Sequence, residues 1–376
     1  MKPRYMILLL TLSVFLMVGC GQKDTPEKPS GADEHIQKEI EDYTKLTDGE
    51  LEVYSLDGDV KAQMELACRY DYGTAAKGRD FGQAKVYYEM AAAQGDLDAL
   101  RCMGYLYLNG CLGEVDLDKA MEYFTQALEL GDVDSNVAIG RTYLAGYGDP
   151  TSSTASALEY IETAFKQGRP SGAYYMAYLY AEGIGVTQDV NQAMELYTSV
   201  LEMKELSRYD AYLVDAARTR IGILYVEGKG IPQDYDKALS NFKMSAKKGY
   251  AMAQYYMGQM YENGYGVDKD YETAYDWYVK AAKQDYAPAL NQLGYLYYKG
   301  NGVDADLDQA IYYHKLAAMQ GYAAAQINLG YLYENGIGVD KDLSTALKYY
   351  TMAAEQNNEG AKEAVTRVSK QLDEEK

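Results

Sequence analysis

Apolar and polar positions along this chain follow a helical period that recurs many times. One clear instance is the stretch at 342–356, DLSTALKYYTMAAEQ. Its apolar residues at positions i, i+3, i+4 and i+7 are Ala346, Tyr349, Tyr350 and Ala353. That spacing puts them on one face of a helix. The stretch at 323–336, AAAQINLGYLYENG, is a second apolar segment of helical length. We therefore predict a pair of helices, A followed by B.

The same two-helix pattern occurs eight times between residues 60 and 358. The repeats align on a small residue inside helix A, namely Ala67, Gly104, Gly140, Ala177, Gly222, Gly258, Gly294 and Gly330. Neighbouring positions are 36 or 37 residues apart, except for 45 between Ala177 and Gly222. A single helix pair cannot bury its own apolar stripe, so the pairs are expected to stack. The sequence thus predicts an all-α solenoid of about eight repeats.

Two further positions mark the ends of the helices. Six residues after the small residue stands a glycine in every repeat: Gly73, Gly110, Gly146, Gly183, Gly228, Gly264, Gly300 and Gly336. Glycine where a helix stops indicates a left-handed backbone. Four residues before the first alanine of helix B stands an N-cap residue: Asp80, Asp116, Ser153, Asp189, Asp234, Asp270, Asp306 or Asp342. The acidic and glycine-rich loops are therefore read as helix ends, and not as calcium or phosphate sites.

The small residue inside helix A has a different explanation. Two repeats use alanine there, so a positive φ is not required. Small volume is required, which implies the close approach of another helix. We expect Ala to be tolerated at Gly294 and Leu to overpack the contact. At Gly300, even Ala should be destabilising, because a left-handed backbone is needed there.

The repeated pattern is A-x-x-x-L-G-x-L-Y-x-x-G-x-G-V-x-x-D-x-x-x-A-x-x-Y-Y-x-x-A-A. Residues 329–354, LGYLYENGIGVDKDLSTALKYYTMAA, match it closely. This pattern resembles the Sel1-like repeat, a helix pair of the tetratricopeptide type. The resemblance implies a right-handed superhelix whose A helices line the concave side. Residues 60–358 would hold the eight repeats, and residues 359–376 one capping helix. The resemblance also implies an adaptor that binds proteins or peptides.

The first twenty residues, MKPRYMILLLTLSVFLMVGC, have a basic start and a thirteen-residue apolar run. That run is typical of a signal peptide and short for a membrane span. The end of the stretch resembles the lipobox of bacterial lipoproteins, which would make residues 1–19 the signal peptide and Cys20 the lipidated residue. The alternative is a plain secretory signal with an incidental cysteine. A lipidated Cys20 predicts a protein held on the extracytoplasmic face of a bacterial membrane.

Residues 20–59 follow as a polar segment containing Pro and Gly, typical of a tether. Within it, Ile36, Ile40, Tyr43 and Leu46 share one helical face, which indicates either a short leading helix packed on the repeats or a nascent helix within the tether. Three cysteines remain in the repeats, Cys68, Cys102 and Cys111, an odd number that does not suggest a disulfide framework.

Composition argues against several functions. The net charge of −20 disfavours binding to nucleic acid. The chain has two histidines, His35 and His314, with no cysteine near either, so we predict no metal site. No phosphate-binding glycine motif occurs and no catalytic set is found, so we predict no cofactor and no catalytic residue.

One face of helix A combines aromatic area with hydrogen-bonding groups. The positions on this face are two residues before each small residue and one residue after it. The residues there are Tyr105, Arg141, Tyr175, Tyr178, Tyr256, Gln259, Gln292, Tyr295, Asn328 and Tyr331. Such side chains suit recognition of a peptide. The alternative is that the tyrosines pack between neighbouring A helices.

Two functions follow as hypotheses. The first is a membrane-anchored extracytoplasmic scaffold that binds a protein or peptide and is not an enzyme. The second is a binder or hydrolase acting on cell-wall material or β-lactams, a role discussed for cysteine-rich relatives. This chain lacks the cysteine pattern of those relatives, and its sequence offers no nucleophile with a matching base.

Overall fold

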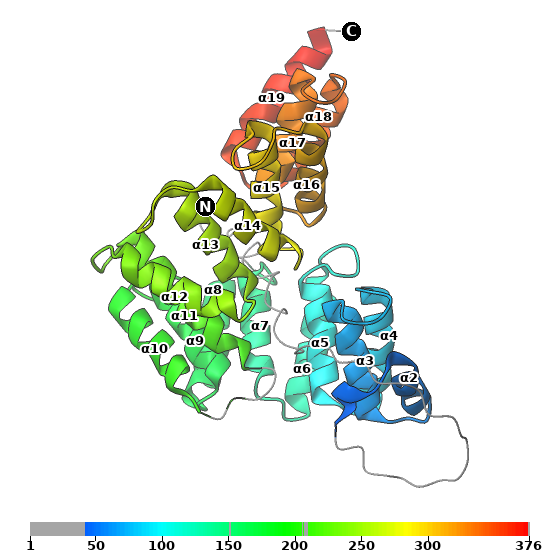
Figure 1. Cartoon of the computed structure of the whole chain (residues 1–376). Coiled ribbons are helices and arrows are strands. Elements are labelled where there is room, and N and C mark those ends of the chain that lie inside the picture. The colour runs from blue at the N-terminus through cyan, green and yellow to red at the C-terminus, as the bar shows by residue number, and fades with distance from the viewer. Residues whose placement is uncertain (1–41, 150–151, 205, 207–209, 375–376) are drawn as a thin grey trace. The chain divides into compact units, whose positions relative to one another are not determined.

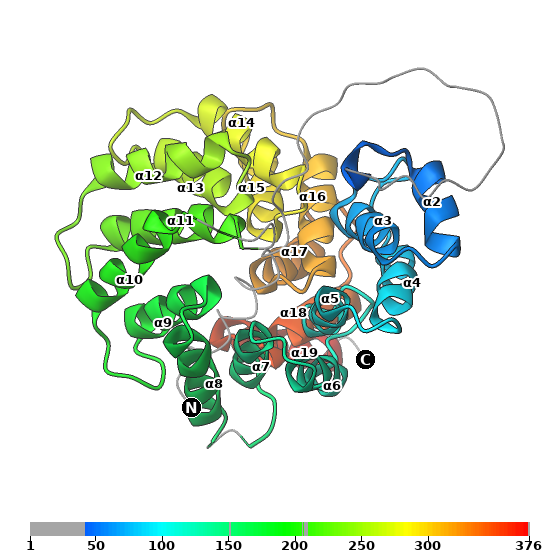
Figure 2. The same ribbon diagram turned by 90° about the horizontal axis from the view of Figure 1, so that it is seen from below.

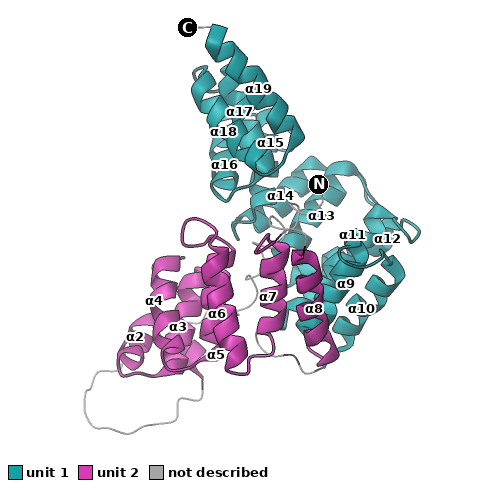
Figure 3. Ribbon diagram, turned by 180° about the vertical axis from the view of Figure 1, so that it is seen from behind, with its two compact units in different colours: residues 1–17, 170–376 teal, residues 18–169 magenta. Residues whose placement is uncertain are grey.

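A computed structural model describes residues 42–149, 152–204, 206 and 210–374. All regular structure in these residues is helical, with eighteen α-helices, one 3₁₀ helix and no strand (Figure 1). The all-α prediction is confirmed. The described residues fall into two compact units, 42–169 and 170–374 (Figure 3). The predicted signal peptide and Cys20 lie outside the described residues.

The unit at 42–169 begins with a short 3₁₀ helix, Tyr43–Lys45, and then contains three helix pairs. Its α-helices are α2 (Asp48–Leu56), α3 (Val60–Tyr72), α4 (Phe81–Ala92), α5 (Leu97–Leu108), α6 (Leu117–Glu129), α7 (Ser135–Leu144) and α8 (Ser153–Lys166). The pairs are α3 with α4, α5 with α6, and α7 with α8. Within this unit, α4 also packs on α5, and α6 packs on α7.

The unit at 170–374 holds five more pairs and a terminal helix. Its helices are α9 (Pro170–Glu182), α10 (Val190–Glu202), α11 (Tyr212–Glu227), α12 (Tyr235–Lys247), α13 (Ala251–Asn263), α14 (Tyr271–Ala282), α15 (Ala287–Lys299), α16 (Leu307–Met319), α17 (Ala323–Asn335), α18 (Leu343–Glu355) and α19 (Glu359–Glu374). Within this unit, successive pairs lie side by side (Figure 2). The last helix, α19, buries Ala364 and Val368 against Leu343 and Tyr350 of α18.

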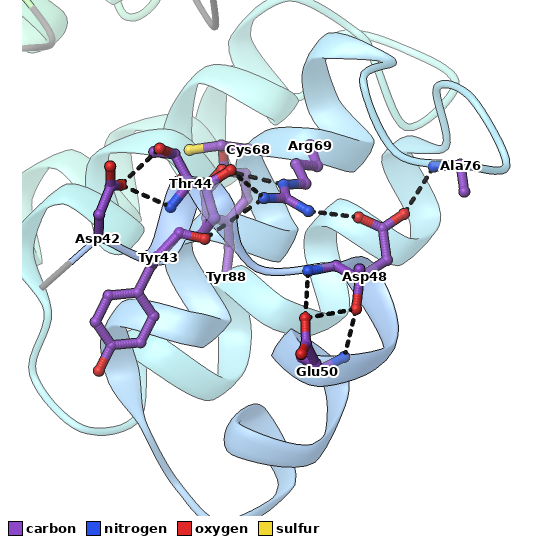
Figure 4. Close-up of polar contacts among 11 residues, drawn as sticks. Asp42, Tyr43, Thr44, Asp48, Glu50, Cys68, Arg69, Ala76 and Tyr88 are labelled. Atoms are coloured by element: carbon purple, nitrogen blue, oxygen red, sulfur yellow. Dashed lines mark hydrogen bonds and ion pairs between the residues drawn. The ribbon is translucent and has the colours of Figure 1, made fainter. Parts of the chain in front are cut away.

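Residues 42–56 fold onto the first repeat, as in the alternative of a leading segment packed on the repeats, so the polar tether does not extend over all of residues 20–59. Arg69 of α3 holds them in place (Figure 4). Its Nη1 donates to Asp48 Oδ1 at 2.8 Å, and its Nη2 donates to the Thr44 carbonyl at 3.0 Å. Asp48 also accepts from the backbone N–H of Ala76 at 2.7 Å. An arginine with several fixed acceptors is a strong local restraint. The polar composition of this segment gave no indication of its contacts with Arg69.

The helix suggested around Tyr43 differs from the one observed. Tyr43 lies in the 3₁₀ helix, which ends before Leu46, and α2 starts only at Asp48. Asp42 and Thr47 explain the break, because each caps a separate helix with its side chain. Ile36 and Ile40 lie outside the described residues.

The helix ends agree with the sequence at all but one position. The eight glycines have φ between +62° and +109°. Seven of the eight predicted caps accept a backbone N–H, and all seven are aspartates. Ser153 is the exception: it is the first residue of α8, and Ser152 is the N-cap, without a side-chain cap bond. The predicted cap at Ser153 is therefore one residue too late.

The small residue of helix A meets the buried side chain in the middle of helix B. A Cβ at Gly104 would lie 2.3 Å from the Phe124 ring, and one at Gly294 would lie 2.8 Å from His314 Nδ1. The expected close approach is confirmed. Our expectation that Ala is tolerated at Gly294 is wrong, because the buried His314 ring would have to shift.

The second glycine of each G-x-G loop has a role that the sequence did not reveal. A Cβ at Gly302 would lie 2.3 Å from the Tyr271 carbonyl oxygen, in the first turn of the preceding B helix. Gly338 lies in the same way against Leu307, and Gly266 against Tyr235. These loops therefore join neighbouring repeats as well as the two helices of one repeat.

Candidate functional site

The candidate residues of helix A divide into buried and accessible ones. Arg141 is 2% exposed, and its guanidinium lies 4.7 Å from the centre of the partly buried Tyr105 ring. Tyr175 and Tyr178 are also buried, and the Arg220 guanidinium lies 5.0 Å from the Tyr178 ring centre. Arg141, Tyr175 and Tyr178 therefore belong to the packed interior. For them, the alternative of packing between helices applies.

Three other candidates are partly buried and contact their own fold. Tyr256 stacks on Phe242 with ring centres 5.1 Å apart. Gln259 Nε2 donates to the Tyr255 hydroxyl at 2.7 Å. Gln292 Nε2 donates to Glu262 Oε2 at 3.1 Å. These side chains support the A helices, and their free surface is small.

Tyr295 of α15 and Tyr331 of α17 are the accessible pair. They are 39% and 47% exposed and stand one repeat apart. With the partly buried Asn328 they line a hollow of about 510 Å³ in the last repeats. The other lining residues are Tyr298, Lys299, His314, Ile327, Leu332, Tyr350, Gly360, Ala364 and Arg367. This hollow brings together three of the ten predicted residues, and it is the candidate site.

His314 distinguishes the repeat at the hollow. In three other repeats the equivalent buried side chain is a tyrosine whose hydroxyl donates to an acid of its own helix A. Tyr88 donates to Asp71 at 3.1 Å, and Tyr350 donates to Glu334 at 2.8 Å. Tyr278 donates to Glu262 in the same way. In the repeat of His314, the ring is shorter and the acid position holds Tyr298.

The His314 side chain is held as a neutral imidazole. It is 3% exposed, and burial lowers its pKa to about 4. Its Nδ1 lies 3.0 Å from Asn291 Oδ1, which also accepts from Asn328 Nδ2 at 2.9 Å. Because that oxygen is the acceptor for both, the proton is on Nδ1 and the lone pair is on Nε2. No described residue hydrogen-bonds to Nε2, and His314 lines the hollow.

The charges around the hollow are positive. Lys299 Nζ lies 4.8 Å from the Tyr298 ring centre and is paired with no carboxylate of the described residues. Arg367 of α19 forms a two-bond pair with Glu334, at 3.0 and 2.8 Å. None of the twelve lining residues is acidic. Lys299 is therefore the unbalanced charge at the hollow, in a chain of net charge −20.

The described residues contain neither a metal-binding cluster nor a membrane-spanning helix. No group of three or more of their His, Cys, Asp or Glu side chains is placed to hold a metal ion. Cys68, Cys102 and Cys111 form no disulfide with one another. Within the same part of the chain, no helix has the length and apolar character needed to cross a membrane.

Comparison with known proteins fits this geometry. The model of the Sel1 repeat matches residues 60–96, 98–132, 170–199, 215–250, 251–286, 287–322 and 323–358. The chain belongs to the Sel1 repeat family. Of the eight helix pairs, the pair α7 with α8 lies outside these ranges, between the second and third matches. It is also the pair whose B helix has a serine N-cap in place of an aspartate. Sel1 repeat proteins are scaffolds typical of protein–protein interaction and are generally not catalytic.

Two curated relatives and one solved structure illustrate the similarity. An uncharacterized protein of Neisseria meningitidis is 27% identical over 220 residues, covering 53% of this chain and 46% of the relative. An Arabidopsis thaliana component of an ERAD-associated E3 ubiquitin-protein ligase is 34% identical over 106 residues, covering 28% of this chain and 16% of the relative. The chain thus spans less than half the length of these relatives. A Sel1 repeat protein of Oxalobacter formigenes aligns at 24% identity with a TM-score of 0.48, covering 90% of this chain and 98% of its own.

Proposed function

We propose that this protein is a membrane-anchored, extracytoplasmic Sel1 repeat scaffold that binds a protein or peptide in the hollow of its last repeats. The observation that carries the proposal is the exposed pair Tyr295 and Tyr331 at the hollow of about 510 Å³. Tyrosine offers a large apolar ring and a hydroxyl at little conformational cost, which is why it is enriched at binding sites.

The spacing of the pair favours an extended ligand. Tyr295 and Tyr331 occupy equivalent positions of α15 and α17, so the two rings repeat along one face. Both tyrosines are outside the buried core of their repeats, in contrast to Tyr175 and Tyr178. An exposed aromatic pair on a solenoid face is therefore available for contact with a partner. The fold itself is stabilised by the helix caps and the buried aromatic rings.

Replacing Tyr295 or Tyr331 with Ala should weaken binding of the natural partner. Each change should cost about 1–2 kcal/mol if the residue is a hot spot. The measurement is a titration of the partner captured by the purified chain. Circular dichroism on each variant checks that helicity is kept, as the surrounding core predicts.

The matched control is Lys348→Ala, an exposed change on α18, which should leave affinity unchanged. Unaltered affinity in well-folded tyrosine variants would mean that the partner docks elsewhere. Loss of helicity in them would mean that the rings are structural.

The membrane anchor rests on the residues before the described part of the chain. The basic start, the apolar run and Cys20 support lipidation. Replacing Cys20 with Ala should therefore move the protein from the membrane fraction to the soluble fraction after alkaline washing. A Cys20→Ala protein that stays with the membrane would contradict the anchor, and Cys111→Ala serves as the control that should stay bound.

A further inference from the structure

We propose that the hollow around His314 selects an acidic side chain, Asp or Glu, from an extended peptide segment. This inference rests on the proposed peptide-binding function and adds the chemistry of the ligand. It commits to an internal acidic side chain of a partner peptide; a peptide C-terminus is the alternative that the experiment separates.

The first support is the acid that this repeat lacks. In three other repeats, an internal carboxylate of helix A accepts from the buried ring of helix B: Asp71 with Tyr88, Glu262 with Tyr278, and Glu334 with Tyr350. The repeat of His314 has Tyr298 at the acid position, and the hollow opens there. A carboxylate brought by the ligand would occupy the region that those three repeats fill with their own acid.

The second support is charge. Lys299 lines the hollow and is paired with no carboxylate of the described residues, whereas the charge of Arg367 is balanced by its two-bond pair with Glu334. No acidic residue is among the twelve that line the hollow, while the whole chain carries −20. The unbalanced Lys299 charge attracts a carboxylate, so an acidic side chain is favoured at the hollow.

The third support is the unused acceptor on His314. His314 lines the hollow, and no hydrogen bond from a described residue to its Nε2 is present. A ligand that brings a donor would give this acceptor a hydrogen-bond partner. A peptide backbone N–H beside the acidic residue would supply that donor, whereas acetate or another simple anion has none. The Tyr295 and Tyr331 rings would flank the same segment.

The test uses three short peptides labelled with a zwitterionic rhodamine at the N-terminus and titrated against the purified full chain in detergent. One is an amidated Leu-Ala peptide with a central Glu, the second has Gln in its place, and the third is the Gln peptide with a free C-terminal carboxylate. We expect the Glu peptide to bind roughly tenfold more tightly than the other two, the scale of one charge-assisted hydrogen bond.

Two variants locate the effect. Lys299→Gln should remove most of the Glu preference, and Lys348→Gln on α18 should not. The double variant His314→Tyr with Tyr298→Glu restores the ring–acid pair of the neighbouring repeats, so it should fold and lose the Glu preference. Circular dichroism and the melting temperature verify that each variant is folded.

Each other outcome overturns the inference. Equal binding of the Glu and amidated Gln peptides would mean that the hollow binds peptides without selecting a carboxylate. Tighter binding of the peptide with a free C-terminus would mean that the hollow recognises a C-terminal carboxylate and not an acidic side chain. Binding of none of the three would also overturn the inference, whereas the proposed function is judged separately by the Tyr295 and Tyr331 variants with the natural partner.

Discussion

Replacing Gly302 with Ala should lower the free energy of unfolding by about 3 kcal/mol or more. Gly302 has φ +70°, and a Cβ there would lie 2.3 Å from the Tyr271 carbonyl oxygen and 2.8 Å from the Glu272 nitrogen. The left-handed backbone costs roughly 1–2 kcal/mol for any other residue, and overpacking adds roughly 1–3 kcal/mol. The obstacle is backbone, which cannot rotate away as a side chain can. Urea unfolding followed by circular dichroism measures the change.

Gly321→Ala is the matched control. Gly321 has φ +79°, but a Cβ there would meet nothing within 4 Å. Its substitution should therefore show only the backbone cost, about 1–2 kcal/mol. Equal losses for the two variants would mean that Gly302 does not contact the preceding repeat as the structure shows.

Replacing Asp71 with Asn should stabilise the protein increasingly as the pH rises. Burial raises the pKa of the Asp71 carboxyl to about 6, although the Tyr88 hydroxyl and the Arg79 charge act in the other direction. In the unfolded chain the pKa is near 3.8, so the folded state holds this proton more tightly. The carboxyl therefore destabilises the fold as the pH rises from about 4 through 6, by up to about 3 kcal/mol. Asn keeps the size and an acceptor for Tyr88 without the charge.

The difference in unfolding free energy between Asp71→Asn and wild type should thus grow between pH 4 and pH 7.5. Denaturant titrations at several pH values give this difference. Asp270→Asn is the control with the opposite sign. Hydrogen bonds from Thr273 and the nearby backbone lower the pKa of Asp270, so wild type should gain over that variant as the pH rises. A pH-independent difference at Asp71 would contradict its buried carboxyl.

The repeat architecture could be predicted from the sequence because its signals are local. Gly264 ends a helix and Asp270 begins the next one within a few residues, and the same chemistry recurs in each repeat. Ser153 failed as a cap because Ser152, its neighbour, is of the same capping type. The sequence left open whether the segment before the repeats packs on them, because the packing of residues 42–56 depends on Arg69, which is distant along the chain.

The site was predicted only in part. Period and residue type place Tyr178 and Tyr295 at equivalent positions, yet one is buried and the other exposed. The difference arises from neighbouring helices, which a single-sequence pattern does not contain. The hollow had a signal that could have been used: His314 stands where other repeats have a tyrosine or another large apolar residue, and Tyr298 stands where three repeats have an acid. Comparison of the repeats with one another would have found both.

Site-specific photo-crosslinking tests the central claim most directly. A benzophenone amino acid is placed at position 331, on the rim of the hollow, or at position 348, on the exposed face of α18, in cells that produce the protein. The account predicts a defined protein or peptide adduct from position 331 that diminishes when Tyr295 is replaced with Ala, and no such adduct from position 348. An adduct from position 348 alone, or the same adduct from both positions, would contradict binding in the hollow.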